Sequence, residues 1–247
     1  MGADAAPVES DGRASRTSPI ADGRRSEKAK RGGRGRSRMG IYGLKPRFRA
    51  ALRPVLAFAC RFHPNTVSGA AVSFALLAGL ALWQAPARPW LLLAAPALFF
   101  LRIAANALDG MVAQERGLAS PRGEMVNEFS DRVNDALILA GLAAGGLVHP
   151  ALSSAALAGA LLVSYLGILP KAAGGSRRYD GPLGKADRML LLGIACVAAW
   201  AAVRFGWPWD AGRVLEASLW LWLALVPVTL AIRWRRAWRE LGRAQDA

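Results

Sequence analysis

The sequence predicts an all-α integral membrane protein with six transmembrane helices, which an amphipathic interfacial helix precedes. Hydrophobic residues make up 53% of the 247 residues, and they gather in runs of about membrane-spanning length, roughly 20 residues. The formal net charge is +15, from 32 Lys and Arg against 17 Asp and Glu. These bases cluster at the two ends of the chain and in one loop. The composition therefore favours a membrane protein over a protein that binds nucleic acid.

The N-terminal segment, residues 1–39, holds Gly, Ser, Ala and Arg with almost no large apolar residue. It cannot bury enough surface to offset its chain entropy, so we expect a disordered basic tail. This tail either attaches to anionic lipid headgroups or stays a solvated segment. Residues 40–65 then alternate apolar and basic side chains, with Pro54 as an interruption, and end in a turn at His63. We expect an amphipathic helix that lies in the headgroup plane.

The membrane domain is expected over residues 66–233, and a cationic tail over 234–247. The six predicted spans cover about 67–84, 90–112, 125–147, 150–170, 188–205 and 215–232. Arg- and Lys-rich segments precede the first span, follow the last, and occupy the loops 113–124 and 171–188. By the positive-inside rule, both termini and these two loops are cytoplasmic, with the protein in the cell membrane.

Polar side chains concentrate where the second predicted span ends and the third begins. They recur at intervals of three and four: Asn106 and Asp109 on one side, and Asn127, Glu128, Asp131 and Asp135 on the other. Such intervals place side chains on one face of a helix, so each helix presents an oxygen-rich stripe. Ionised carboxylates at membrane depth are costly without a partner or a role. Two facing stripes would form a site suited to Mg²⁺ or Mn²⁺.

This stretch resembles the signature of the CDP-alcohol phosphotransferase (CDP-alcohol phosphatidyltransferase) family. The signature reads Asp, two residues, Asp-Gly, two residues, Ala-Arg, eight residues, Gly, three residues, Asp, three residues, Asp. The positions that match are Asp109, Gly110, Ala113, Gly123 and Asp131. The departures are Asn106 for the first Asp, Gln114 for the Arg, and Asn127 for the third Asp.

The resemblance implies a reaction. A phosphatidyl or similar phospho-alcohol group would pass from a CDP-alcohol, with CDP-diacylglycerol as the expected donor, to an acceptor hydroxyl, and CMP would be released, as in phospholipid biosynthesis. The resemblance also implies two divalent ions, Mg²⁺ or Mn²⁺, and a homodimer. The residues expected to bind CDP are Asn106, Asp109, Gly110, Ala113 and Gly123.

The departures from the signature change the expected metal ligands. Four aspartates would balance the +4 of two divalent ions, whereas Asn106 and Asn127 each lose a charge. The acids Asp109, Glu128, Asp131 and Asp135 again total −4. We therefore expect Asp109, Asp131 and Glu128 to hold metal, with amide oxygens from Asn106 and Asn127. The resemblance makes Asp131 the general base, and Asp135 is its substitute or an outer ligand.

Two basic features accompany the acids. Gln114 removes a guanidinium beside the donor pyrophosphate, and Arg116, Arg122 or a base of the next cytoplasmic loop is expected to replace it. In that loop, Arg177, Arg178, Lys185 and Arg188 either bind an anionic acceptor or lipid phosphate, or only set the topology. Two other functions stay open: a catalytically inactive scaffold of the family, and a transporter that uses the intramembrane acids.

Overall fold

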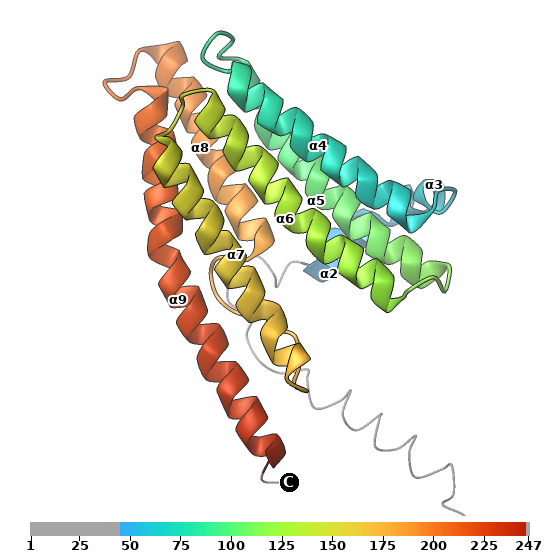
Figure 1. Cartoon of the computed structure of the whole chain (residues 1–247). Coiled ribbons are helices and arrows are strands. Elements are labelled where there is room, and N and C mark those ends of the chain that lie inside the picture. The colour runs from blue at the N-terminus through green and yellow to red at the C-terminus, as the bar shows by residue number, and fades with distance from the viewer. Residues whose placement is uncertain (1–44, 246–247) are drawn as a thin grey trace, which may run out of the picture. The chain divides into compact units, whose positions relative to one another are not determined.

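The computed structural model describes residues 45–245, and the regular secondary structure in this range is entirely helical (Figure 1). The predicted disordered tail, residues 1–39, and the start of the predicted interfacial segment lie outside the described range. The helices within it are α2 (Lys45–Ala51), α3 (Arg53–Ala59), α4 (Pro64–Gln84), α5 (Leu91–Glu115), α6 (Pro121–Ala144), α7 (Pro150–Ala172), α8 (Lys185–Phe205) and α9 (Ala211–Gln245).

The segment predicted as one interfacial helix forms two short helices, α2 and α3. The break falls at Leu52, because Pro54 lies in the first turn of α3, where a residue without an amide hydrogen is tolerated. Leu52 packs in a small hydrophobic cluster with Met111 of α5, whereas Phe58 is 57% exposed. One side of this segment therefore rests on α5 and the other presents apolar surface, as an interfacial segment requires.

Each predicted apolar run lies in one long helix from α4 to α9. Five of these helices, α4, α5, α7, α8 and α9, are long and apolar enough to cross a membrane. The sixth, α6, has 24 residues, but charged side chains occur throughout its first 15 residues, including Glu124, Glu128, Asp131 and Asp135. The all-helical fold and five candidate spans are thus confirmed, while a membrane crossing by α6 stays a prediction.

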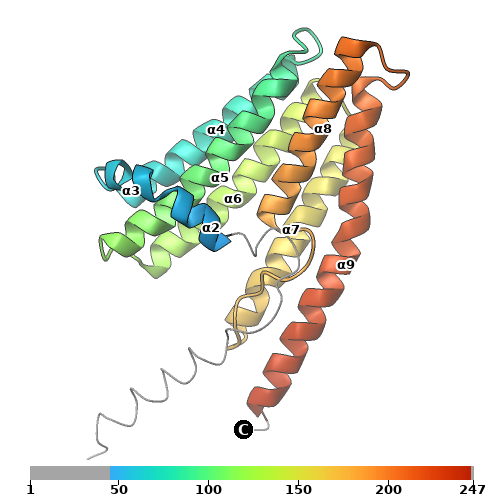
Figure 2. The same cartoon turned by 180° about the vertical axis from the view of Figure 1, so that it is seen from behind.

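The long helices form two groups of three (Figures 1 and 2). Helices α4, α5 and α6 pack together, α9 packs on both α7 and α8, and contacts of α5 with α8 and of α6 with α7 join the groups. The backbones of α4 and α6 approach closely at Gly79 and Gly141, where any side chain would collide with the backbone of the neighbouring helix. This close approach holds the acidic stripe of α6 against the α4–α5 pair.

We call one end of this bundle the site end, because the polar stripes lie there. At the site end α4, α6 and α8 begin, and α5 and α7 finish. Helix α9 has 35 residues, about 50 Å at the usual rise, and extends farther at this end than its apolar part requires. The predicted cationic tail after residue 233 is helical and continues α9 without a break to Gln245.

Candidate active site

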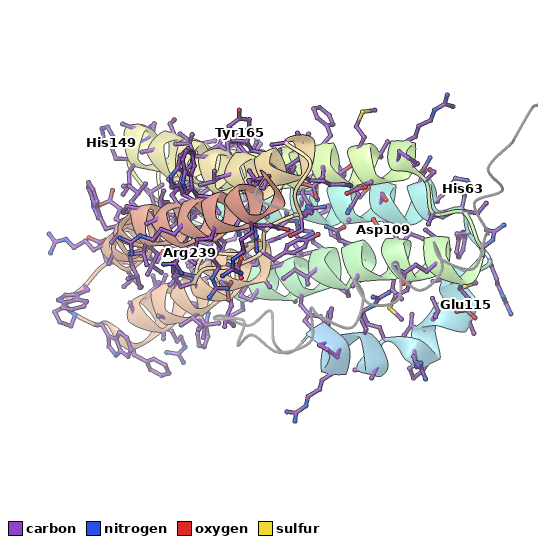
Figure 3. All side chains as sticks on the ribbon, turned by 90° about the horizontal axis from the view of Figure 1, so that it is seen from below. His63, Asp109, Glu115, His149, Tyr165 and Arg239 are labelled. Atoms are coloured by element: carbon purple, nitrogen blue, oxygen red, sulfur yellow. The ribbon has the colours of Figure 1, made fainter. Side chains whose placement is uncertain are left out.

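The polar stripes of α5 and α6 face each other. The side-chain amide of Asn106 donates a hydrogen bond to Oδ1 of Asp131 on α6. One turn along α5, Asp109 accepts a hydrogen bond of 2.7 Å from the Ser68 hydroxyl of α4, and its carboxylate lies close enough to Asp131 for their charges to interact. Figure 3 shows Asp109 between the ribbons of α4 and α5. The structure therefore brings together Asn106, Asp109 and Asp131, as the helical spacing predicts.

A lysine from α8 completes this group. Lys185 Nζ donates to both carboxylate oxygens of Asp131, at 2.9 and 2.7 Å. The first turn of α8 is fixed by the Asp187 carboxylate, which accepts a hydrogen bond of 2.9 Å from the backbone amide of the N-cap residue Gly184, as in one half of a capping box. Three helices, α5, α6 and α8, thus converge on the single carboxylate of Asp131.

Asp135 lies one turn deeper in α6 and belongs to a buried ion cluster that adjoins Asp131. Arg102 of this cluster also donates to the backbone carbonyl of Asp131 at 3.3 Å and lies 3.9 Å from its carboxylate. Asp135 pairs with Arg102 at 3.0 Å and with Arg188 at 2.6 Å, and all three side chains are almost completely buried. The Arg188 guanidinium also lies over the ring of Trp222, 5.6 Å from its centroid. Buried charges need such partners. The structure therefore differs from the prediction of Asp135 as a substitute base or outer ligand, because two guanidinium groups occupy its carboxylate.

Glu128 is also directed away from Asp109. One of its carboxylate oxygens pairs with Arg177, and the other accepts a bond of 2.5 Å from Arg132. Within residues 45–245, no group of three or more His, Cys, Asp or Glu side chains is placed to hold a metal ion. The structure thus does not bring Asp109, Asp131 and Glu128 together as predicted. Only Asp109 and Asp131 lie beside Asn106 among the described residues.

The remaining oxygens still fit a hard divalent cation. Oδ1 of Asn106 is buried and, among the described residues, has no hydrogen-bond partner, although its amide nitrogen has one. A buried oxygen without a donor costs free energy unless something compensates it. It lies on the same face as the Asp109 and Asp131 carboxylates, and Mg²⁺ commonly takes one or two carboxylates together with water and substrate phosphates. Asn127 is half-buried on the same stripe of α6, one turn before Asp131.

The small residues of the signature lie near the end of α5 and at the start of α6. Gly110 is exposed, and a Cβ added there would meet no atom within 4 Å, so open space adjoins the backbone. Gly123 lies in the first turn of α6, where its amide donates to the Ser120 hydroxyl at 3.1 Å. Ala113 is half-buried near the end of α5. We predict that a nucleotide approaches the backbone at these positions.

Comparisons with known proteins identify the family of this chain. A scan against protein-family models gives no match. The chain is 35% identical over 158 residues to the inner membrane protein YnbA of Escherichia coli. This alignment covers 63% of this chain and 78% of YnbA. It is 31% identical over 159 residues to the archaetidylinositol phosphate synthase of Aeropyrum pernix. This alignment covers 62% of this chain and 78% of the synthase. The chain belongs to the CDP-alcohol phosphatidyltransferase family. Members of this family are transferases.

Solved structures share the fold of this family member. The phosphatidylinositol phosphate synthase PgsA1 of Mycobacterium tuberculosis with CDP-DAG bound superposes with a TM-score of 0.59 at 20% identity, over 78% of this chain and 92% of that chain. The same synthase in complex with manganese and citrate gives a TM-score of 0.58, over 78% and 88%. At this identity the likeness shows the fold alone.

The family signature has an arginine where this chain has Gln114, and the structure places a different arginine there. Arg116, one predicted replacement, donates instead to the carbonyl of Phe62 at 2.9 Å. Arg49 of α2 donates to the Gln114 side-chain oxygen at 2.7 Å. Nothing in the sequence links residues 49 and 114.

Arg102 is a partner of the acids that the sequence analysis missed. Its position could have indicated this role, because it is a charged residue in the middle of an apolar run.

The four predicted acceptor-binding bases do not form one cluster. Lys185 and Arg188 contact different acids of α6, as described above, and Arg177 pairs with Glu128. Arg178 points the other way and pairs with Glu240 of α9. Glu240 also accepts bonds from the amide and hydroxyl of Ser176, so the α7–α8 loop is fastened to the extension of α9.

Proposed function

We propose that this protein transfers a phosphatidyl or related phospho-alcohol group from a CDP-alcohol to an acceptor hydroxyl and releases CMP. The observation that carries the proposal is the convergence of Asn106, Asp109 and Asp131 from two helices, with an unpartnered buried oxygen among them. CDP-diacylglycerol is the proposed donor, because the site lies at one end of membrane-spanning helices and a protein of the same fold has been solved with CDP-DAG bound.

In the proposed reaction, the acceptor oxygen attacks the phosphorus that carries the alcohol, and the bond from that phosphorus to the CMP oxygen breaks. The acceptor proton passes to a carboxylate oxygen of Asp131. Asn106 and Asn127 add amide oxygens beside this acid and Asp109. Lys185 holds Asp131 by both oxygens, so one of them must leave the lysine to receive the proton.

Mg²⁺ or Mn²⁺ is the proposed cofactor, with Asn106, Asp109 and Asp131 as ligands and Asn127 as a further oxygen donor. The manganese complex of the structural neighbour PgsA1 supports this choice. Such a cation neutralises pyrophosphate charge and stabilises the leaving group. We propose one ion at these oxygens, because Lys185, Arg102 and Arg188 already pair with Asp131 and Asp135 and leave less negative charge for a second ion. A second ion stays a prediction.

We infer that the site end faces the cytoplasm, since the basic α7–α8 loop and the Arg-rich extension of α9 lie there. CMP would then leave directly into the soluble phase. Pairing into a homodimer stays an expectation. For an anionic acceptor we propose Arg177 and Lys185 as the binding residues, because both adjoin the acids of α6. Arg188 is 1% exposed and is assigned to the buried ion cluster instead.

The decisive experiment incubates the purified protein with CDP-diacylglycerol, Mn²⁺ or Mg²⁺ and a panel of alcohols, polyol phosphates and lipids. CMP release and a new phospholipid in the mass spectrum are expected with at least one acceptor. A folded protein that releases no CMP with any acceptor would be an inactive scaffold. Ion or solute flux in proteoliposomes without CMP release would identify a transporter.

A further inference from the structure

A hollow of about 320 Å³ lies beside the site, between the α2–α3 segment and the end of α5. Its volume is within the range of small-molecule sites. From α2 and α3 it is lined chiefly by Arg49, Arg53 and Leu56, and from α5 by Met111, Gln114 and Glu115. Figure 3 shows Glu115 beside the blue helices, on a different side of α5 from Asp109. The hollow is therefore a neighbour of the reaction site and not part of it.

The charges that face this hollow differ from those of the α7–α8 loop and the start of α8. Arg177, Arg178, Lys185 and Arg188 each pair with an acid. In the described part of the chain neither Arg49 nor Arg53 forms an ion pair, although Glu115 lines the same hollow. The hollow thus presents two guanidinium groups that are not neutralised by a carboxylate, which is a suitable arrangement for an anion.

One of these guanidinium groups is held in place. Arg49 is half-buried and donates to the Gln114 side-chain oxygen at 2.7 Å, and it reaches across from α2 to α5. A guanidinium has five N–H donors in a planar fork, and this bond uses one of them. Gln114 therefore orients a cation that keeps donors for a second partner. Position 114 is also where the family signature has an arginine. The contact with Arg49 therefore places a guanidinium next to a position that lacks its own.

The surroundings indicate the chemical class of the anion. Leu56 and Met111 give the hollow apolar walls beside the two arginines. The α2–α3 segment exposes Val55, Phe58 and Phe62, which suit burial at the level of lipid headgroups. A ligand with a phosphate joined to an apolar tail matches both features, and arginine recognises phosphate through paired N–H bonds.

We propose that this hollow binds the phosphate of a phospholipid, with Arg49, oriented by Gln114, as its principal ligand and Arg53 as a second. The phosphate belongs either to the CDP-linked donor or to a neighbouring anionic lipid. The first source rests on the proposed function, and the second does not. Arg49 would be a positioning residue for the reaction and a direct ligand of the lipid.

The test measures equilibrium binding of fluorescent CDP-diacylglycerol and fluorescent phosphatidylglycerol to the full-length protein in neutral detergent micelles. Arg49→Ala is expected to raise the Kd of at least one lipid about tenfold, the effect of losing one charge-assisted bond. Arg47→Ala removes the same charge two residues away, outside the lining of the hollow, and is expected to change either Kd by less than about twofold. In the Arg49→Ala background, Gln114→Arg is expected to restore most of the binding.

The two lipids distinguish the sources. Weaker binding of CDP-diacylglycerol alone assigns the hollow to the donor, and weaker binding of phosphatidylglycerol, alone or together with the donor, assigns it to lipid phosphate in general. Equal behaviour of Arg49→Ala and Arg47→Ala toward both lipids overturns the proposal. The binding measurement needs no turnover. A wild-type protein that binds these lipids but releases no CMP would therefore contradict the proposed function without contradicting the proposed lipid-phosphate site. Thermal melting of each variant checks that it is folded.

Discussion

The side-chain amide of Asn106 on α5 donates a hydrogen bond to the carboxylate of Asp131 on α6. The family signature has a carboxylate at both positions, and two carboxylates at this separation repel each other unless a cation lies between them. The amide thus lets α5 and α6 meet without a metal ion. Its own oxygen is left buried and without a partner in the described residues, where it can face a cation.

The contact predicts an effect of Asn106→Asp that depends on Mn²⁺. The substitution removes the hydrogen bond and adds a negative charge next to Asp131, so the melting temperature should fall when no divalent ion is present. Because the same charge strengthens a cation site, added Mn²⁺ should raise the melting temperature of this variant more than that of the wild type. Asn106→Ala loses the bond and gains no charge, and it should show the fall without the larger Mn²⁺ response.

Asp131 is expected to be indispensable for turnover. Asp131→Asn keeps the shape of the side chain and removes the base, so CMP release should drop by at least about a hundredfold, the usual range for general base catalysis. Asp210→Asn makes the same change at an exposed position where α9 begins, and it should leave CMP release unchanged. Unaltered release by a folded Asp131→Asn protein would contradict the role proposed for this carboxylate.

The facing of the two polar stripes could be predicted from the sequence, because intervals of three and four fix which side chains share a helical face. The apolar runs likewise predict the positions of the long helices to within a few residues, except at the end of α9, which continues past the run to Gln245. Both inferences use only local periodicity, and both agree with the structure at Asn106, Asp109 and Asp131.

Periodicity could not predict which of the acids pair with basic side chains and which remain available for a metal ion. Glu128 has one local partner, Arg132, four residues on. The other bases that neutralise these acids lie far away in sequence: Arg102 and Arg188 for Asp135, and Arg177 for Glu128. Periodicity says nothing about contacts between distant helices. The charge count over one stretch therefore made Glu128 a metal ligand and Asp135 a substitute base or outer ligand, whereas the folded chain pairs both with arginine.

The buried ion cluster should matter more for stability than for metal binding. Arg102→Leu leaves Asp135 with one of its two guanidinium partners and removes a charge from a completely buried position, so a cost of about 3–5 kcal/mol is expected. Arg213→Ala breaks the exposed pair with Asp210, which should cost about 0–1 kcal/mol. Chemical unfolding in detergent, followed by tryptophan fluorescence, compares the two variants.

The α7–α8 loop should be held in place by Glu240. This carboxylate accepts bonds from the amide and hydroxyl of Ser176 and pairs with Arg178, so Glu240→Gln weakens all three contacts by removing their shared charge. Amide hydrogen exchange over residues 173–184 is expected to become faster, while the long helices keep their protection. Since Arg177 lies in this loop and Lys185 follows it directly, the KM for an anionic acceptor should rise as well.

Glu216→Gln supplies the matched control for this last prediction. Glu216 lies near the start of the same helix, at the opposite end of the bundle, where it accepts a bond of 3.0 Å from the His149 amide. The same chemical change there should leave exchange over residues 173–184 as it is in the wild type. If the two variants change exchange in the loop equally, the effect comes from a general loosening of α9, and the contact between the loop and Glu240 is not what orders the segment before Lys185.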